Sequence, residues 1–408
     1  MKSTKRSSCY IPCITKMVWI YLSVNNEYIM RLLFVIFGRY PSPDASSKRI
    51  SNYISALHVE KIQVDVLPLA FSKRSNISLF ILEFFIPFLV FFRVLVKAHH
   101  YASVFVYGFG WISKLLIILA CRLKRKPVAI ELNEKPFSIS GGSRRDIILK
   151  YFAPINEHCL KRIVFPLIDG YLVISNKLYE YVSKYKKSNA IVCKIPILVD
   201  YNYYQKEISK PDCSVPYILN SARMNDHKDG IINVFKAFSI LVNQEGMDLN
   251  FYLTSSIAPK DIRNQIEDII LENKLKTKVK FLGDLDENTL LSYQKHCSML
   301  VLNKVDSVQN RYNFATKLGE YMALGIPIIT SQIGEVKFYL SDEVSCLYID
   351  PQKPNDLAAA MIRIFEDENL AYGLGQEGKR IAENEFDYKK QSKRLSEFFI
   401  NLLKITTK

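Results

Sequence analysis

Glycine and proline are scarce in this sequence: its 408 residues include 15 Gly and 16 Pro, and 49% are hydrophobic against 23% charged. These proportions exclude a collagenous, a low-complexity and an intrinsically disordered chain. At roughly 150 residues per domain, the length predicts two or three folded domains, each large enough to bury an ordinary core.

Cysteine pairs with the spacing of a metal or redox site are also lacking. The eight Cys residues are scattered, and the two that lie close together, Cys9 and Cys13, have no second pair and no His partners. We therefore expect neither a zinc site nor a disulfide framework, and we interpret the cysteines as small core residues in a reducing cytosol. Asp284 and Asp286 fit an Asp-x-Asp metal motif, but the predicted helix that follows favours an N-cap.

Acidic residues are few in the first half of the chain. Residues 1–200 carry 29 Lys and Arg against 12 Asp and Glu, whereas residues 201–408 carry 26 against 28. This asymmetry predicts two halves that meet different partners, one of them anionic. Nucleic acid, an acidic lipid surface and a phosphorylated small molecule are all anionic. The lack of a recognition motif argues against nucleic acid.

An uncharged apolar run long enough to span a membrane is missing as well. The candidate segment, Leu79–Val96, contains Glu83, Pro87 and Arg93, and a charge at the centre of a bilayer costs about 2.5–3.5 kcal/mol. We therefore predict a buried or interfacial helix there.

The next predicted helix, Trp111–Leu123, runs into the basic segment Arg122–Lys126. Basic residues near an anionic leaflet gain on the order of 1 kcal/mol each, so we predict peripheral contact with an anionic membrane; a solvated helix end is the alternative. Lys16 interrupts the apolar run that a secretory signal requires. Residues 1–29 are expected to be a tail or an over-long start, with Met30 as the alternative initiator.

Short β-branched and aromatic runs alternate with amphipathic stretches, which is the pattern of parallel sheets with crossover helices. The predicted strands are Leu32–Phe37, Ile62–Leu67, Ser103–Tyr107, Val128–Leu132, Gly170–Ile174, Ile191–Ile195, Tyr217–Asn220, Leu249–Leu253, Val279–Leu282, Met299–Leu302, Pro327–Thr330 and Cys346–Ile349. We predict an α/β protein of two doubly wound domains, residues 30–200 and 217–386. A polar linker at 201–216 joins them, and residues 387–408 form a closing helix with one apolar and one basic face.

Two segments of the second half place cations near strand ends, where open α/β sheets bind their ligands. In the first, Arg223 and Lys228 follow the strand Tyr217–Asn220. They suit a pyrophosphate, because Arg offers a planar fork and Lys a point charge. Such a pair alone is weak evidence for a pyrophosphate site, because the chain contains 55 Lys and Arg residues.

The second segment is a predicted short helix, Thr316–Ala323, which Gly325 and Pro327 terminate. Lys317 and Glu320 share a face near its N-terminus, where free N–H groups and the helix dipole attract an anion. A lone Glu on a helix is ordinarily a solvated charge. The functional interpretation is a carboxylate that accepts from a pair of sugar hydroxyls.

Together these segments resemble the C-terminal half of the family-4 retaining glycosyltransferases, which have the GT-B fold: two Rossmann-like domains that face a central cleft. The resemblance covers roughly Tyr217–Phe386. It rests on the order and spacing of Ser-Ala-Arg-Met-Asn-Asp-His-Lys-Asp-Gly, Phe-Ala-Thr-Lys-Leu-Gly-Glu-Tyr-Met-Ala and Ile-Gly-Glu-Val. It implies that Arg223 and Lys228 bind the diphosphate of a nucleotide-sugar donor and that Glu320 holds the ribose hydroxyls.

The same resemblance implies that Gly283 lies beside the base and that Thr316 and Lys317 lie beside the phosphates. Tyr312 stands where the family often has a first glutamate, eight positions before the second, and Asn313 is the candidate to contact the donor sugar in its place.

In the first half, Asn133 takes the place where many relatives have a His that faces the reacting sugar, and Glu134 follows it. These two residues are expected either to order an acceptor hydroxyl or to cap the next turn.

The resemblance implies a retaining transferase that moves a sugar from a nucleoside-diphosphate-sugar donor to a glycan or lipid-linked acceptor, without a cofactor or a metal. We expect it in the cytoplasm at the inner face of the plasma membrane, in capsular or surface polysaccharide biosynthesis. The alternatives are a sugar-nucleotide epimerase of the same fold, and a non-catalytic membrane- or nucleic-acid-binding protein.

Overall fold

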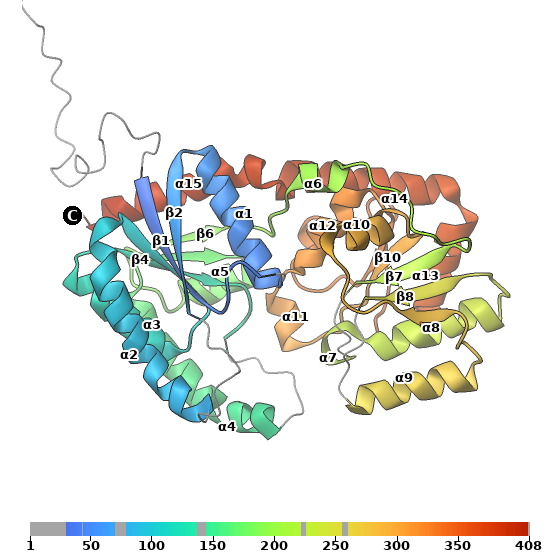
Figure 1. The fold of residues 1–408 in the computed structure, drawn as a ribbon, viewed down its shortest axis with the longest axis horizontal. Helices are drawn as coiled ribbons and strands as arrows, with labels where there is room; N and C mark the ends of the chain where they lie inside the picture. The colour runs from blue at the N-terminus through green and yellow to red at the C-terminus, as the bar shows by residue number, and fades with distance from the viewer. Residues whose placement is uncertain are drawn as a thin grey trace, which may run out of the picture.

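The arrangement of the chain comes from a computed structural model (Figure 1), which describes residues 30–42, 44–69, 79–136, 144–221, 226–254 and 260–406. Within these residues, two six-stranded parallel sheets lie side by side, each covered by helices. The predicted tail, residues 1–29, and the predicted phosphate ligand Arg223 lie outside the described residues.

The first sheet has the strand order β2-β1-β3-β4-β5-β6, and all of its neighbouring strands are parallel. Its strands are β1 (Met30–Phe37), β2 (Ile62–Leu69), β3 (Ser103–Tyr107), β4 (Val128–Leu132), β5 (Gly170–Val173) and β6 (Ile191–Lys194). All residues of β3 and β4 are buried, as expected for apolar strands that helices cover on both faces.

The second sheet has the order β12-β11-β10-β7-β8-β9 and is also parallel. Its strands are β7 (Tyr217–Asn220), β8 (Asn250–Leu253), β9 (Val279–Phe281), β10 (Met299–Leu302), β11 (Ile328–Thr330) and β12 (Leu347–Tyr348). One face packs in a core of its own, in which the rings of Phe235 and Phe251 lie 5.1 Å apart. The predicted strands agree with these twelve to within two residues at each end.

Helices connect the strands in both domains. Those before β7 are α1 (Ala45–Val59), α2 (Leu79–Lys97), α3 (Trp111–Leu123), α4 (Arg144–Cys159), α5 (Asn176–Ser183) and α6 (Tyr201–Gln205). Those after it are α7 (Asp226–Asp229), α8 (Ile231–Asn243), α9 (Lys260–Glu272), α10 (Glu287–Lys295), α11 (Val308–Tyr312), α12 (Thr316–Leu324), α13 (Pro354–Glu366), α14 (Glu368–Ile381) and α15 (Tyr388–Thr406). Short helical turns occupy Ala98–His100, Leu160–Val164, Phe165–Leu167, Val336–Phe338 and Ala382–Phe386.

The segment predicted as a linker without regular structure contains helix α6. Asp200 caps this helix by accepting from the N–H of Tyr203 at 3.3 Å, and Gln205 Nε2 donates to the carbonyl of Ala323 in α12 at 2.8 Å. A helix of five residues is too short for periodicity to reveal, and here the cap and the contact with α12 stabilise it.

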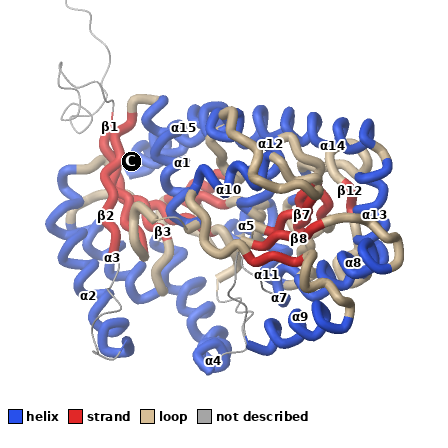
Figure 2. Tube along the Cα trace, turned by 45° about the vertical axis from the view of Figure 1, so that its right-hand side comes forward, coloured by secondary structure: helices blue, strands red, loops and turns tan. Residues whose placement is uncertain are grey.

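The last helix, α15, packs on the first domain, as predicted for the closing helix (Figures 1 and 2). Leu395, Phe398, Phe399 and Leu402 are buried in the same core cluster as Phe34 of β1. The C-terminal helix therefore completes the core of the N-terminal domain.

The chain passes between the domains twice, and the two passages lie side by side. Val199 and Asp387 form an isolated parallel bridge. The N–H of Val199 donates to the Phe386 carbonyl at 2.8 Å, and the N–H of Tyr388 donates to the Val199 carbonyl at 3.0 Å. A Cβ on Gly319 of α12 would lie 3.0 Å from the Val199 side chain, so this glycine lets α12 approach the crossing closely.

The predicted interfacial helix is α2. Ile86, Val90 and Val94 are buried, whereas Phe88 and Phe92 are exposed. In the part of the chain that the structure describes, no helix is long and apolar enough to cross a membrane.

Candidate functional site

The N-terminus of α12 lies at the centre of the candidate site. The N-cap residue, Ala315, has no polar side chain to satisfy the N–H groups of the first turn. The helix ends at Gly325, whose φ of 73° is the left-handed conformation that favours glycine. The predicted limits of this helix are therefore confirmed to within one residue, and its N-terminal N–H groups can face an anion.

Lys317 sits in the first turn of α12 and is partly buried. Its pKa is lowered to about 8, mainly by burial; Glu320 and Asp229 act to raise the pKa, whereas the charges of Lys304 and Lys48 act to lower it. Lys48 belongs to α1 of the first domain, so both domains contribute cations here. An anion bound at this point would relieve the repulsion among them.

Lys304 follows the carboxyl end of β10 and is paired with Asp229 of α7. This lysine was not predicted from the sequence, because a single Lys two residues after a strand has no recognisable pattern. Its position beyond the end of a central strand is the signal that could have found it.

Lys228, a predicted phosphate ligand, lies in α7. Its carbonyl accepts from Asn310 Nδ2 at 2.8 Å and from the N–H of Val305 at 3.2 Å. Helix α11 and the segment after β10 therefore fix the backbone of this residue. Asp229, the next residue, pairs with the Lys304 ammonium. Both charges act on Lys317, so α7 lies near the start of α12.

Glu320 lies one turn further along α12 than Lys317. Its charge raises the pKa of both Tyr203 and Tyr204 of α6, in addition to the larger effect of their burial. The pKa of Tyr203 is also raised by Glu287 and Asp286, which begin α10. Tyr203 therefore lies between Glu320 and the turn that precedes α10.

That turn contains Gly283, which follows β9 and has a φ of 73° with open space around the position of a Cβ. Asp286 caps α10 by accepting from the N–H groups of Asn288 and Thr289 at 3.0 Å. The N-cap interpretation of the Asp-x-Asp segment is confirmed. Among the described residues, no group of three or more His, Cys, Asp or Glu side chains could hold a metal ion.

Tyr312 and Asn313 end helix α11. The Tyr312 carbonyl accepts from Ser175 Oγ of the first domain at 2.5 Å, and the N–H of Asn313 donates to the Gln309 carbonyl at 3.1 Å. The ring of Tyr312 lies near Lys135 and so faces the first domain.

In the first domain, Asn133 and Glu134 follow β4. Asn133 Nδ2 donates to the Tyr107 hydroxyl at 2.9 Å, and Glu134 accepts from Gln309 Nε2 of α11 in the second domain. Burial, together with the charge of Glu131, raises the pKa of Tyr107 to about 12, and the side chain of Ser46 hydrogen-bonds to it.

The first turn of α1 thus connects the two halves of the site. Ser46 contacts Tyr107, the partner of Asn133, and Lys48, two positions later, acts on Lys317 of α12. Arg49 pairs with buried Glu131 of β4 and so anchors α1 to the sheet. The structure relates two of the predicted residues to the other domain: Lys48 acts on Lys317, and Gln309 donates to Glu134. We call the region around these two residues, together with the nearby Lys228, Glu320 and Asn133, the interdomain site.

Glu335 is a second residue that was not predicted from the sequence, although it belongs to the quoted Ile-Gly-Glu-Val segment. It is 2% exposed; one oxygen accepts from Lys194 Nζ and the other from the N–H of Asn176, both at 2.8 Å. Both partners lie in the first domain, so Glu335 ties the domains together.

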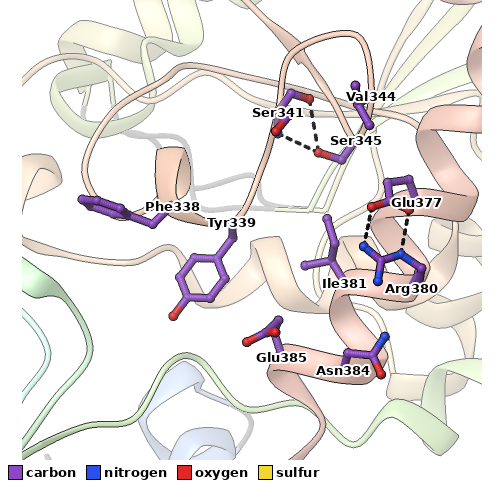
Figure 3. A pocket seen from close by; sticks show the side chains of 10 residues that line it. All are labelled: Phe338, Tyr339, Ser341, Val344, Ser345, Glu377, Arg380, Ile381, Asn384 and Glu385. Carbon is purple, nitrogen blue, oxygen red and sulfur yellow. Dashed lines mark hydrogen bonds and ion pairs between the residues drawn. The ribbon is translucent and has the colours of Figure 1, made fainter.

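A hollow of about 360 Å³ on the second domain lies elsewhere; Tyr339, Glu377, Arg380 and Glu385 are among the residues that line it (Figure 3). Arg380 donates to both oxygens of Glu377 at 2.7 and 2.8 Å. Its charge is thus balanced inside the hollow, and none of the predicted site residues lines it.

The second half of the chain is similar to a known protein family. Residues 205–381 match the family described as "Glycosyl transferases group 1". This segment, which is less than half of the chain, is similar to that family. It contains Lys228, Gly283, Asn313, Thr316, Lys317 and Glu320.

Curated and solved proteins are also similar to this chain. The chain is 26% identical over 148 residues to "Uncharacterized glycosyltransferase MJ1178" of Methanocaldococcus jannaschii, a match that covers 36% of this chain and 40% of the relative. HepE of Anabaena, solved in complex with UDP and glucose, has a TM-score of 0.67 at 15% identity over 90% of this chain and 98% of its own. Sucrose-phosphate synthase of Thermosynechococcus elongatus has a TM-score of 0.70 at 17% identity over 92% and 100%. The predicted GT-B fold is confirmed.

Proposed function

We propose that this protein is a retaining glycosyltransferase of family 4 that moves a sugar from a nucleoside-diphosphate-sugar donor to a glycan or lipid-linked acceptor. The observation that carries the proposal is the cluster of Lys48, Lys304 and Lys317 at the N-terminus of α12. These cations and the free N–H groups of the helix form a site for a diphosphate.

In such a transfer, negative charge develops on the diphosphate as the bond to the sugar breaks. Lys317, Lys304 and Lys228, together with Arg223, would stabilise that charge electrostatically, and no cofactor or metal is needed for this role. Stabilisation of the leaving group therefore contributes more than a general base does.

The nucleoside would lie between α12 and the turn before α10. Glu320 would accept from the two ribose hydroxyls, and the open space at Gly283 would receive the base. Asn313 and Thr316 would contact the sugar and the phosphates. HepE, which was solved in complex with UDP and glucose, supports a nucleotide in this fold.

The acceptor would bind on the first domain beside β4. Glu134 accepts from Gln309 across the interface, and a hydroxyl of the acceptor could replace that donor. Asn133 is positioned by Tyr107 and would orient the acceptor from the other side.

A thermal-shift panel of UDP, GDP, ADP and CMP tests the donor site. We expect one nucleoside diphosphate to stabilise the wild-type protein and Glu320→Ala to abolish that shift. The absence of a shift with every nucleotide would contradict the proposal. Conversion of the donor sugar without any acceptor would favour the epimerase instead.

We further propose that the protein binds peripherally to an anionic membrane at the cytoplasmic face, where capsular or surface polysaccharides are assembled. Phe85, Phe88, Phe92 and Val96 of α2 are 51–68% exposed. Helix α3 packs against α2, and its Ile112, Leu119 and Leu123 are exposed as well. The exposed basic residues beside them are Arg93, Lys97, Arg122, Lys124 and Arg125. An apolar helix face with basic neighbours is typical of interfacial binding.

Co-sedimentation with phosphatidylglycerol vesicles tests this surface. Phe88→Asp/Phe92→Asp is expected to lower the bound fraction about tenfold or more, because charges replace two exposed aromatic rings that would enter the membrane interface. Tyr372→Asp, at an exposed aromatic position on α14 of the second domain, is the control. Equal binding of both variants would contradict the proposed surface.

A further inference from the structure

A hollow of about 300 Å³ lies where the first domain meets the end of α11. We call it the lysine pocket after the residues that define it: Lys135, Lys161, Lys177, Lys184, Tyr181 and Tyr312. Glu157 and Glu180 also line it. With four ammonium groups against two carboxylates, the pocket carries an excess of positive charge.

Glu157 is engaged inside the lysine pocket. It accepts from Lys161 Nζ at 2.7 Å and from the Tyr181 hydroxyl at 3.1 Å, and Lys135 Nζ lies 3.9 Å from it. Burial raises the pKa of Glu157, but these hydrogen bonds and charges outweigh burial and lower it overall. The carboxylate therefore stays ionised and holds two of the lysines in place. Lys177 and Lys184 are exposed and can close on a ligand.

Tyr312 forms the wall that the second domain contributes. The ammonium groups of Lys135 and Lys177 lie 5.8 and 5.9 Å from the centre of its ring, a cation–π distance. The ring of Tyr181 lies 6.2 Å from it. The aromatic side chain that replaces the expected first glutamate thus belongs to this pocket.

The lysine pocket lies between the acceptor-side residues and an apolar surface. Lys135 directly follows Glu134 of the interdomain site. Glu157 is on α4, whose Tyr151, Phe152 and Ile155 are exposed. Trp111, at the start of α3, donates to Asn156 of α4 at 3.1 Å, which connects α4 to the surface proposed to contact the membrane.

We propose that the lysine pocket binds the phosphate group of a lipid-linked acceptor. Several ammonium groups that converge without a fixed fork suit a phosphate, which accepts hydrogen bonds on every side. The exposed apolar side chains of α4 would guide the lipid chain from the pocket toward the bilayer. This inference rests on the proposed transferase function and names its acceptor class.

Calorimetric titration of the full chain with farnesyl diphosphate, inorganic pyrophosphate and farnesol tests the proposal. The donor site is first saturated with the nucleoside diphosphate that the thermal-shift panel identifies. The pocket variant is Lys177→Gln/Lys184→Gln, and the control is Lys236→Gln/Lys390→Gln, which removes two exposed lysines elsewhere. All four positions are exposed, so the fold should tolerate both variants.

We expect the pocket variant to weaken farnesyl diphosphate binding about tenfold or more and the control to leave it within about twofold, because the charges act at short range. The affinity for the nucleoside diphosphate should be the same in all three proteins. Unchanged binding by the pocket variant, or equal weakening in both variants, would overturn the assignment.

The three ligands distinguish the source of the phosphate. A lipid-linked acceptor is supported if farnesyl diphosphate binds more tightly than pyrophosphate and farnesol binds weakly. If the two diphosphates bind equally, the lipid-linked acceptor is refuted and the pocket would take a soluble phosphorylated acceptor. If no nucleotide binds, the proposed function fails. The titration without nucleotide then still tests the pocket.

Discussion

Lys317 allows the donor site to be tested through pH. Burial holds its pKa at about 8, and Lys304 and Lys48 add to that effect. A bound diphosphate would place negative charge beside the ammonium group and raise the pKa again. Binding should therefore require the protonated lysine, and nucleotide affinity should fall as the pH rises above 8.

The expected size follows from the pKa. With a pKa of about 8, the protonated fraction falls about 30-fold between pH 7 and pH 9.5, so the dissociation constant should rise by about the same factor. Without ligand, the free energy of unfolding should instead increase with pH. The depressed pKa destabilises the folded state below pH 8, and this cost disappears as the pH rises toward 10.5. Because the group is partly exposed, we expect an effect of about 1–2 kcal/mol.

The assay is calorimetric titration of the nucleoside diphosphate at pH 7 and pH 9.5, with wild type beside Lys317→Met. The substitution should weaken binding at pH 7, remove most of the pH dependence and raise the ligand-free melting temperature at pH 7. Lys114 is also buried and has a pKa of about 8, so only the difference between the two proteins reports on Lys317. Wild-type affinity that does not change with pH, or the same change in Lys317→Met, would refute the reasoning.

Four further substitutions test other parts of the structure. Glu335→Ala should lower the free energy of unfolding by about 2–4 kcal/mol in a denaturant titration, because it leaves a lysine and an N–H group without their buried acceptor. Gly334→Ala should cost about 2–3 kcal/mol, since its Cβ would lie 2.4 Å from the Asn310 carbonyl oxygen at a φ of 70°; Gly373→Ala, with open space around its Cβ, should be neutral or stabilising. Arg223→Ala should lower turnover far more than thermal stability, and an equal loss of both would make this residue structural.

Most of the fold could be predicted because parallel strands buried on both faces have a local signature. The predicted first and last residues of the buried strands β3, β4 and β7 match the structure. Turn residues on both sides of a continuous apolar run mark where such a strand begins and ends. Helix α12 was found from its two terminators, Gly325 and Pro327. Helix α6 was not, because its stability depends on a cap and on contact with α12 rather than on any repeat of apolar residues.

The candidate site was predictable only in part. Lys228, Lys317 and Glu320 belong to segments with a recognisable order and spacing. Glu335 interacts with residues 141 and 159 positions away, and such partners leave no local pattern in the sequence. Lys304 likewise interacts with Asp229 and Lys317, which come near it only in the folded chain.

Helix α15 makes the first domain discontinuous in sequence, and this affects the order in which the protein can be synthesised and folded. Strand β1 is among the first described parts of the chain to leave the ribosome, yet the core around Phe34 requires Leu395, Phe398 and Phe399. At roughly 5–20 residues per second, translation of the intervening chain takes on the order of 20–80 s. During that time the second domain can fold completely while the first still exposes an apolar groove. The first domain can therefore be completed only after α15 has been synthesised, and its demand for chaperones should persist until then.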